Sequence, residues 1–304
     1  MNIIFDTTLP HEWFTRLEGI ATAGTPANAE VLMTNFYMKV SESTLAQYPK
    51  LRLITQYGVG YDNIDIAACR KRGILVTNTP QPVIEPTAEL CMALIFGIAR
   101  RTAELDHSIR KNEIEFGLLK NLGNSLYGKT LGIIGMGNIG RSVARRAIAC
   151  GMDIIYHNRR PISADILQAS HLESSRYVSQ DELLKTSDFV SLNLPYTAEV
   201  HHLISNKELH LMKPTAYLIN TARGAHVHEQ ALIEALRDGV IAGAALDVYE
   251  HEPQIAEELK SLPNVLLVPH IGTGTWEGRK AMCDAMIDNI IAYANGKREE
   301  MTTV

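Results

Sequence analysis

The feature that most constrains the fold is a glycine-rich hexapeptide, Gly135-Met136-Gly137-Asn138-Ile139-Gly140, which directly follows a short apolar run. Residues 131–134 are predicted to form a buried strand, and residues 138–150 a helix. Glycines at this spacing let a strand turn at once into a helix, with Gly135 in the tight turn and Gly140 where helix and strand pack closely. The hexapeptide therefore predicts a strand-turn-helix unit of a parallel sheet.

The same alternation of short apolar runs and longer helical segments extends over most of the chain. A first series of strands is predicted at residues 3–5, 31–33, 53–55 and 74–77. A second series is predicted at residues 131–134, 154–156, 189–192, 216–219, 244–246 and 265–268. This alternation is typical of parallel sheets covered by helices. Two such series in 304 residues predict two doubly wound α/β domains.

Two long helices are predicted outside these series. Residues 86–111 have helical periodicity and are predicted to form one helix that connects the domains. Residues 280–294 are predicted to form a second helix. Because no strand follows this second helix, we expect it to return to the first domain.

Composition and charge exclude several classes of protein. A net charge of −5 gives no electrostatic reason to expect a nucleic-acid partner. The N-terminus has no basic, apolar leader, and the longest apolar run, residues 91–99, is shorter than the roughly 20 residues of a membrane span. The four cysteines are far apart, which favours reduced thiols, and no metal is expected. We expect a cytoplasmic protein without a membrane partner.

The hexapeptide also favours a dinucleotide cofactor. Gly137 lets the backbone approach a pyrophosphate, and the amides of Asn138 and Ile139 open the helix that would face it. The next strand normally ends in an acid that binds the ribose 2′-hydroxyl. Here Asn158 stands in that place, followed by Arg159 and Arg160, whose guanidinium groups suit a 2′-phosphate. NADPH is therefore favoured and NADH is the alternative. Both arginines could instead form only a solvated turn.

Three chemically useful side chains follow strands of the second series. Arg223 comes after residues 216–219, Glu252 after residues 244–246 and His270 after residues 265–268. The carboxyl ends of parallel strands meet at one sheet edge, where ligands bind. Arginine binds a carboxylate with two parallel hydrogen bonds, histidine exchanges protons near neutral pH, and a carboxylate beside it favours the imidazolium. The alternatives are a surface glutamate in an acidic loop and a histidine that caps a strand.

Together, the motifs resemble the D-isomer-specific 2-hydroxyacid dehydrogenase family over nearly the whole chain. The resemblance is carried by Gly128-Lys129-Thr130-Leu131-Gly132-Ile133-Ile134-Gly135, Asn220-Thr221-Ala222-Arg223-Gly224, Glu252-Pro253 and Pro269-His270-Ile271-Gly272. It implies a homodimer in which a Rossmann cofactor domain is inserted into a discontinuous, flavodoxin-like substrate domain. We place the substrate domain at residues 1–95 and 275–304, and the cofactor domain at residues 96–274.

The resemblance also implies roles for single residues. Arg223, Glu252 and His270 match the family's catalytic residues, and Val59 and Gly60 match those whose amides bind the substrate carboxylate. The matching cofactor residues are Thr221, Ala222 and Asp247 at the nicotinamide, Leu194 and Pro195 on the adenosine side, and Gly272.

Other positions depart from the family or match it loosely. Trp276 is unusual and is expected to shape either the pocket or a dimer contact. Phe36 and Met38 lie near the positions at which relatives select substrate, but a core role is equally open.

The expected function is NADPH-preferring reduction of small 2-oxo acids, namely glyoxylate, hydroxypyruvate or pyruvate, to D-2-hydroxy acids. The main rival is an NADH-dependent D-lactate dehydrogenase. A phosphoglycerate dehydrogenase is disfavoured because no regulatory extension precedes Val304, and a formate dehydrogenase because Glu252 stands where that branch has an amide. From another class, an NAD(P)-sensing binding protein on the same scaffold remains open.

Overall fold

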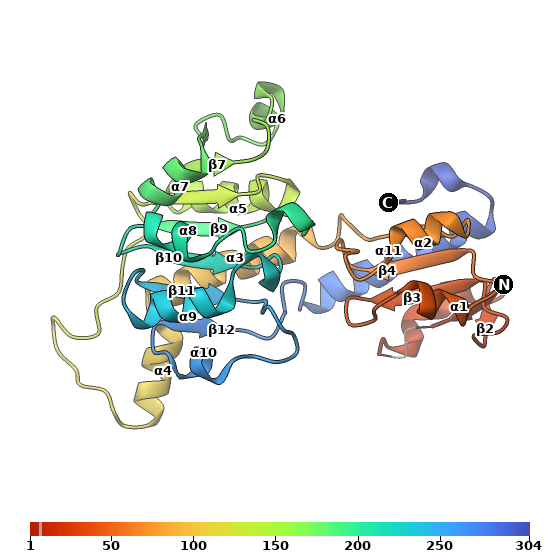
Figure 1. Cartoon of the computed structure of the whole chain (residues 1–304), viewed down its shortest axis with the longest axis horizontal. Coiled ribbons are helices and arrows are strands. Elements are labelled where there is room, and N and C mark those ends of the chain that lie inside the picture. Colours follow the sequence, from red (N-terminus) through yellow and green to blue (C-terminus); the bar gives the residue numbers. More distant parts are fainter. Residues whose placement is uncertain (6–7) are drawn as a thin grey trace. The chain divides into compact units, whose positions relative to one another are not determined.

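The computed structural model describes residues 1–5 and 8–304 and divides into two compact units (Figure 1). Unit 1 consists of Met1–Pro86 and Thr273–Val304, and unit 2 of Thr87–Gly272. The predicted fold, in which a Rossmann domain interrupts a second α/β domain, is confirmed.

The units divide earlier in the chain than the boundaries we placed at residues 95/96 and 274/275. Helix α3 (Ile84–Ala99) explains the first difference, because its apolar face from Ala88 to Ala99 packs into the core of unit 2. Nearly all of α3 therefore belongs to unit 2.

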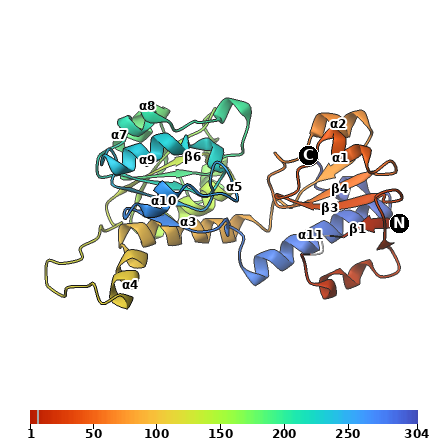
Figure 2. The same ribbon diagram turned by 60° about the horizontal axis from the view of Figure 1, so that its bottom comes forward.

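Unit 1 has a five-stranded parallel sheet in the order β2-β1-β3-β4-β5, which is the flavodoxin-like order. Its strands are β1 (Asn2–Ile4), β2 (Thr22–Ala23), β3 (Val31–Asn35), β4 (Leu53–Tyr57) and β5 (Leu75–Thr77). Its helices are η1 (His11–Leu17), α1 (Glu42–Ala46), α2 (Ile66–Lys71), α11 (Trp276–Ala294) and η4 (Arg298–Glu300). Figure 2 shows α1 and α2 on one face of the sheet and α11 on the other. As predicted, the C-terminal helix returns to the first domain.

Unit 2 has a seven-stranded parallel sheet in the order β12-β11-β10-β9-β6-β7-β8. Its strands are β6 (Thr130–Ile134), β7 (Asp153–His157), β8 (Arg176–Tyr177), β9 (Phe189–Leu192), β10 (Tyr217–Asn220), β11 (Gly243–Leu246) and β12 (Val265–Leu267). The strand order reverses between β6 and β9, which is the crevice where doubly wound sheets bind ligands.

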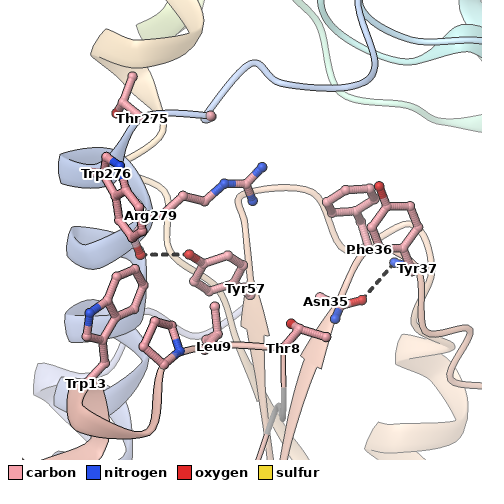
Figure 3. Close-up of a pocket in the computed structure, with 12 residues that line it drawn as sticks. Thr8, Leu9, Trp13, Asn35, Phe36, Tyr37, Tyr57, Thr275, Trp276 and Arg279 are labelled. Carbon is pink, nitrogen blue, oxygen red and sulfur yellow. Dashed lines mark hydrogen bonds between the residues drawn. The ribbon is translucent and has the colours of Figure 1, made fainter.

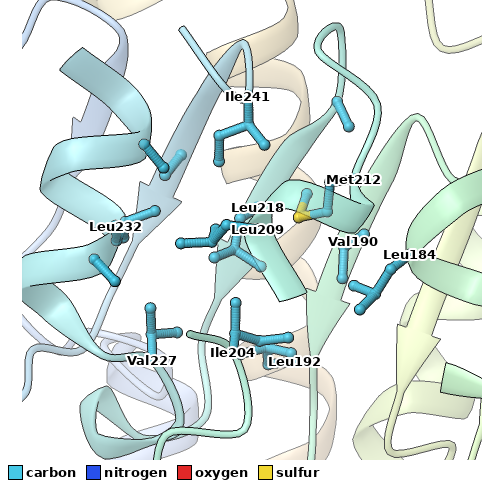
Figure 4. Close-up of a cluster of buried hydrophobic side chains, with 14 of the residues drawn as sticks. Leu184, Val190, Leu192, Ile204, Leu209, Met212, Leu218, Val227, Leu232 and Ile241 are labelled. Carbon is cyan, nitrogen blue, oxygen red and sulfur yellow. The ribbon is translucent and has the colours of Figure 1, made fainter. Parts of the chain in front are cut away.

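Helices cover both faces of this sheet. One face is covered by α3 and α5 (Asn138–Ala149), and the other by α7 (Gln180–Thr186), α8 (Asn206–Leu211), α9 (Glu229–Arg237) and α10 (Glu257–Ser261). Figure 4 shows the second of these cores, in which Leu184, Leu209 and Leu232 meet strand residues such as Val190 and Leu218. The remaining elements are α4 (Thr102–Arg110), α6 (Ala164–Ala169), η2 (Ala198–Val200) and η3 (Gly224–His226).

The predicted connector helix over residues 86–111 is wrong as a single element. It divides into α3 and α4 at Arg100 and Arg101, and Arg101 has a left-handed backbone with φ of 53°. The Arg101 guanidinium donates to the Glu104 carboxylate and to the Leu122 carbonyl, which holds the break. Within the described residues, no helix is long and apolar enough to cross a membrane.

Candidate active site

The three predicted catalytic residues come together at one edge of the unit 2 sheet. Strands β10, β11 and β12 are neighbours, and Arg223, Glu252 and His270 follow their carboxyl ends. Nδ1 of His270 donates a hydrogen bond of 2.7 Å to Oε2 of Glu252. The other carboxylate oxygen of Glu252 accepts the Tyr249 amide at 2.9 Å. The carboxylate is therefore fixed on both sides and holds one nitrogen of the imidazole.

The electrostatics favour an ionised Glu252. Burial raises the pKa of its carboxyl, but the hydrogen bond from His270 and the positive charges of His270 and Arg223 outweigh this effect, so the pKa lies below its ordinary value. Arg223 is thus close enough to Glu252 to act on its charge. An ionised carboxylate on Nδ1 directs the other ring nitrogen, Nε2, to act as the proton donor.

The turn that carries Arg223 is held by Asn220 at the end of β10. The Asn220 side chain accepts the Ala222 amide at 3.0 Å and donates to the Arg223 carbonyl at 2.9 Å. These two bonds fix the backbone from residue 220 to residue 223. Arg223 therefore extends from the rigid end of a strand rather than from a mobile loop.

Asp247 holds the turn that carries His270, a role that the motifs alone did not reveal. Its buried carboxylate accepts the amides of Ile271 at 2.6 Å and Gly272 at 2.8 Å, and its carbonyl accepts the His270 amide at 2.9 Å. His270 has a left-handed backbone, with φ of 52°, that this clamp maintains. Burial, the largest influence, raises the pKa of Asp247 to about 6 despite those bonds. The sequence signal for this role was an acidic residue, Asp247, directly after strand β11.

The glycine-rich turn fits a dinucleotide. Gly135 has φ of 98°, and a Cβ there would lie 2.6 Å from the Asn193 carbonyl oxygen, while a Cβ on Gly140 would lie 2.2 Å from the Gly135 oxygen. Nothing lies within 4 Å of the Cβ position of Gly137, which leaves room for a phosphate. Gly137 also precedes α5 without a side-chain cap, so Asn138 and Ile139 present the first amides of a twelve-residue helix.

The residues expected to select the cofactor follow β7. Oδ1 of Asn158 accepts the Met136 amide at 2.8 Å, which joins this residue to the glycine-rich turn. Arg159 and Arg160 are exposed, and neither guanidinium forms an ion pair within residues 1–5 and 8–304. The amide is thus fixed beside the dinucleotide turn, and both cations are available to an anion.

The remaining predicted cofactor residues lie at the carboxyl ends of neighbouring strands. Leu194 and Pro195 follow β9, and the Leu194 Cβ would lie 2.9 Å from a Cβ on Gly135. Thr221 and Ala222 follow β10, and Gly272 is bound by Asp247. All of these residues belong to unit 2.

Val59 and Gly60 belong to unit 1, in the turn after β4. Their carbonyls are occupied, because the side-chain amide of Asn78 donates to the Val59 carbonyl and the side-chain amide of Gln56 donates to the Gly60 carbonyl. Among the described residues, their own amides donate to no acceptor. This polarity suits an anion such as a carboxylate.

Unit 1 also contains a cavity of about 530 Å³ at the carboxyl ends of its strands (Figure 3). It lies where the strand order reverses between β1 and β3, the usual ligand position in such sheets. Its lining residues are Thr8, Leu9, Pro10, Trp13, Asn35, Phe36, Tyr37, Tyr57, Gly274, Thr275, Trp276 and Arg279. Phe36 and Trp276 thus line a cavity, whereas Met38 packs against the core formed by Leu32, Val40 and Ile54.

Arg279 is a cavity residue that the motifs did not reveal. Figure 3 shows its side chain extending from α11 into the cavity, and its guanidinium carbon lies 5.7 Å from the centre of the Tyr57 ring. It forms no ion pair with a carboxylate in the described part of the chain. The sequence alone could not predict this residue, because its place in the cavity depends on which strands lie beside the start of α11.

Comparisons with known proteins agree with this architecture. The family model described as "D-isomer specific 2-hydroxyacid dehydrogenase, NAD binding domain" matches residues 92–272. A glyoxylate reductase from Thermococcus litoralis is 48% identical over 275 residues, which cover 88% of this chain and 81% of the relative.

Two solved structures extend the likeness to both units. A D-lactate dehydrogenase from Aquifex aeolicus, complexed with NAD and lactic acid, has a TM-score of 0.88 and 30% identity, and the match covers 100% of this chain and 98% of that one. An NADPH-dependent glyoxylate/hydroxypyruvate reductase from Sinorhizobium meliloti has a TM-score of 0.84 and 29% identity, with coverage of 96% and 93%. The chain therefore belongs to the D-isomer-specific 2-hydroxyacid dehydrogenase family and is an NAD(P)-dependent oxidoreductase.

Proposed function

We propose that this protein is an NADPH-preferring reductase of small 2-oxo acids, with glyoxylate as its first substrate and hydroxypyruvate and pyruvate as further ones. The observation that carries the proposal is the hydrogen bond of 2.7 Å between His270 and Glu252 at the strand end next to Arg223. The 48% identity to a glyoxylate reductase supports the choice of substrate class.

In this proposal each residue has a distinct role. Arg223 binds the substrate carboxylate through its guanidinium, and the amides of Val59 and Gly60 are further donors that suit a carboxylate. When bound, the nicotinamide cofactor supplies the hydride. His270 transfers a proton from Nε2 to the carbonyl oxygen, which becomes the hydroxyl of the D-2-hydroxy acid. Glu252 stabilises the imidazolium before transfer, and Asp247 keeps the histidine turn in position.

The preference for NADPH is argued from the end of β7. A 2′-phosphate carries negative charge, and the strand end has no carboxylate to repel it. Asn158 keeps an amide nitrogen to donate while its oxygen binds the Met136 amide. Arg159 and Arg160 are exposed and bind the phosphate by planar, charge-assisted hydrogen bonds.

The cavity in unit 1 has a lining that suits the variable group of a small 2-oxo acid. It adjoins Tyr57, which directly precedes the Gly58-Val59-Gly60 turn. Aromatic walls contributed by Phe36 and Trp276 suit small apolar groups, and Arg279 suits a polar one such as a hydroxymethyl. The lining therefore suits both the methyl group of pyruvate and the hydroxymethyl group of hydroxypyruvate.

We further propose a homodimer, formed through an arm that we define as α4 and residues 111–125. Figures 1 and 2 both show the arm extending from the body of unit 2. Phe116 and Leu118 on the arm are 84% and 94% exposed, and Leu119 and Leu122 are also exposed. An apolar patch of this kind marks a surface that a partner covers.

Initial rates test the function directly. Glyoxylate, hydroxypyruvate and pyruvate are each reduced with NADPH and with NADH, and kcat/KM is compared for all six pairs. We expect glyoxylate to be fastest and NADPH to be preferred by at least about tenfold, the effect of one charge-assisted contact. A preference for NADH with pyruvate would support a D-lactate dehydrogenase instead, and no turnover with any pair would contradict the reductase.

A further inference from the structure

A second cluster of titratable side chains lies in unit 2, on the loop after η2 and the segment after β11. His201, His202 and Glu250 each offer one ligand atom, and these atoms all lie within 4.8 Å of one another. Nε2 of His202 donates to Oε1 of Glu250 at 2.5 Å. The rings of His201 and His202 are stacked with their centres 3.7 Å apart. None of the roles proposed above uses these residues.

Neighbouring groups hold each member of the cluster in place. The second oxygen of Glu250 accepts the Glu229 amide at 2.9 Å. Nδ1 of His201 lies 3.2 Å from the Tyr196 hydroxyl. His202 has a left-handed backbone, with φ of 51°, and its amide donates to the Ala225 carbonyl at 2.8 Å. Outer contacts of this kind orient the ligands of metal sites.

We propose that His201, His202 and Glu250 form a binding site for a divalent transition-metal ion, with zinc as the best fit. Two imidazoles and one carboxylate are a ligand set that zinc accepts, and three protein ligands leave a fourth position for water. The ion would replace the proton that His202 now donates to Glu250. Because His201 is exposed, the ion enters from solvent.

The chemistry of the residues distinguishes this cluster from an ordinary ion pair. The hydrogen bond from His202 to Glu250 accounts for two of the three groups, but it does not use His201. A shared metal ion would use nitrogen atoms of both stacked imidazoles as well as the carboxylate. Histidine and glutamate are 48 residues apart, so no sequence spacing indicates the site.

Calorimetric titration of the full-length, tag-free protein with zinc chloride, after treatment with a chelator, tests the proposal. We expect one ion per chain, and a midpoint of thermal unfolding that rises by about 5 °C when zinc greatly exceeds its Kd. His201→Ala and Glu250→Gln should each weaken binding by at least about tenfold. Glutamine at position 250 can still accept the Glu229 amide, so this variant should stay folded.

His171→Asn is the matched control, because it removes an exposed imidazole from the turn after α6 of the same unit and keeps a residue type that tolerates the left-handed backbone there, with φ of 55°. Its zinc affinity should equal that of the unaltered protein. Cobalt(II) provides a spectroscopic check, since its visible absorption should appear with the unaltered protein and disappear with His201→Ala. The proposal is overturned if the unaltered protein binds no zinc, or if both cluster variants bind it with unchanged affinity. Neither readout depends on the proposed reaction.

Discussion

At the scale of single residues, the site depends on two carboxylates with opposite properties. Glu252 is ionised and accepts a hydrogen bond from the histidine, whereas burial makes Asp247 harder to ionise. The first acts on the charge of His270 and the second on its backbone. Their separate roles lead to different expectations when each is replaced by its amide.

Replacing Glu252 with glutamine should lower the rate of reduction. Glutamine keeps the size and can still bind His270 and the Tyr249 amide, but it no longer stabilises the imidazolium. Because reduction needs a proton on the ring, kcat should fall by about tenfold or more while cofactor affinity is kept. Initial rates at saturating glyoxylate and NADPH measure this loss.

His270→Ala is the comparison for that experiment. It should lower kcat by about 10²- to 10⁴-fold while leaving cofactor affinity nearly unchanged. A kcat of Glu252→Gln equal to that of the unaltered protein would show that the carboxylate has no influence on the acid. Near-normal turnover in His270→Ala would rule out its role as the proton donor.

Replacing Asp247 with asparagine should change how stability depends on pH. The pKa of this carboxyl is raised from 3.8 to about 6 in the folded protein, so the folded state binds more protons than the unfolded state between those values. The group therefore favours folding below about pH 4, and this contribution is lost as the pH rises to about 6. The loss amounts to roughly 3 kcal/mol.

Urea unfolding at pH 4, 5, 6 and 7 measures this effect. The free energy of unfolding of Asp247→Asn relative to the unaltered protein should rise by roughly 2.5 kcal/mol from pH 4 to pH 7, because part of the contribution is already lost at pH 4. A difference that stays constant over that range would show that Asp247 titrates normally.

At the scale of secondary-structure elements, the sequence predicted the main strands and where they place the three proposed catalytic residues. Apolar runs identify buried parallel strands well, and Arg223, Glu252 and His270 follow three of them. Strands β2 and β8 were missed, because two exposed residues each carry no apolar pattern. The break between α3 and α4 was missed because it depends on the contact of Arg101 with Glu104 and Leu122, not on a glycine or proline.

The element that we propose to select the cofactor is the segment after β7. Asn158→Asp keeps the oxygen that accepts the Met136 amide but adds a negative charge that repels a 2′-phosphate. Its kcat/KM with NADPH should fall about ten- to a hundredfold, while the value with NADH is kept or increases. Initial rates with NADPH and with NADH measure this change in cofactor preference.

Single arginine variants refine that test. Arg159→Ser and Arg160→Ser should each weaken the binding of NADPH but not that of NADH. The variant with the larger effect identifies the residue nearer the phosphate. Arg70→Ser, which removes an exposed guanidinium from α2 of unit 1, is the control and should leave both cofactors unaffected. Equal losses with NADPH and NADH in all variants would contradict a phosphate site.

At the scale of the whole molecule, the apolar side chains of the arm have no partner among the described residues of a single chain, which leaves their exposure unexplained. Side chains such as Phe116, Leu118 and Leu119 are exposed to a degree that a monomer rarely tolerates in one patch. Their exposure costs free energy in water, and a second copy of the chain would cover them. The sequence pattern alone did not reveal this patch, because an irregular segment has no periodicity from which to infer burial.

The combined substitution Leu118→Asp and Leu119→Asp should therefore convert a dimer into a monomer. Charges buried in an apolar interface without partners are strongly unfavourable, so association should weaken by at least about a hundredfold. Sedimentation equilibrium measures the molar mass of each protein over a range of concentrations. Ile166→Asp places a charge on another exposed apolar position, on α6, and should remain dimeric. If the unaltered protein is already monomeric, or if the double variant stays dimeric, the arm does not form the interface.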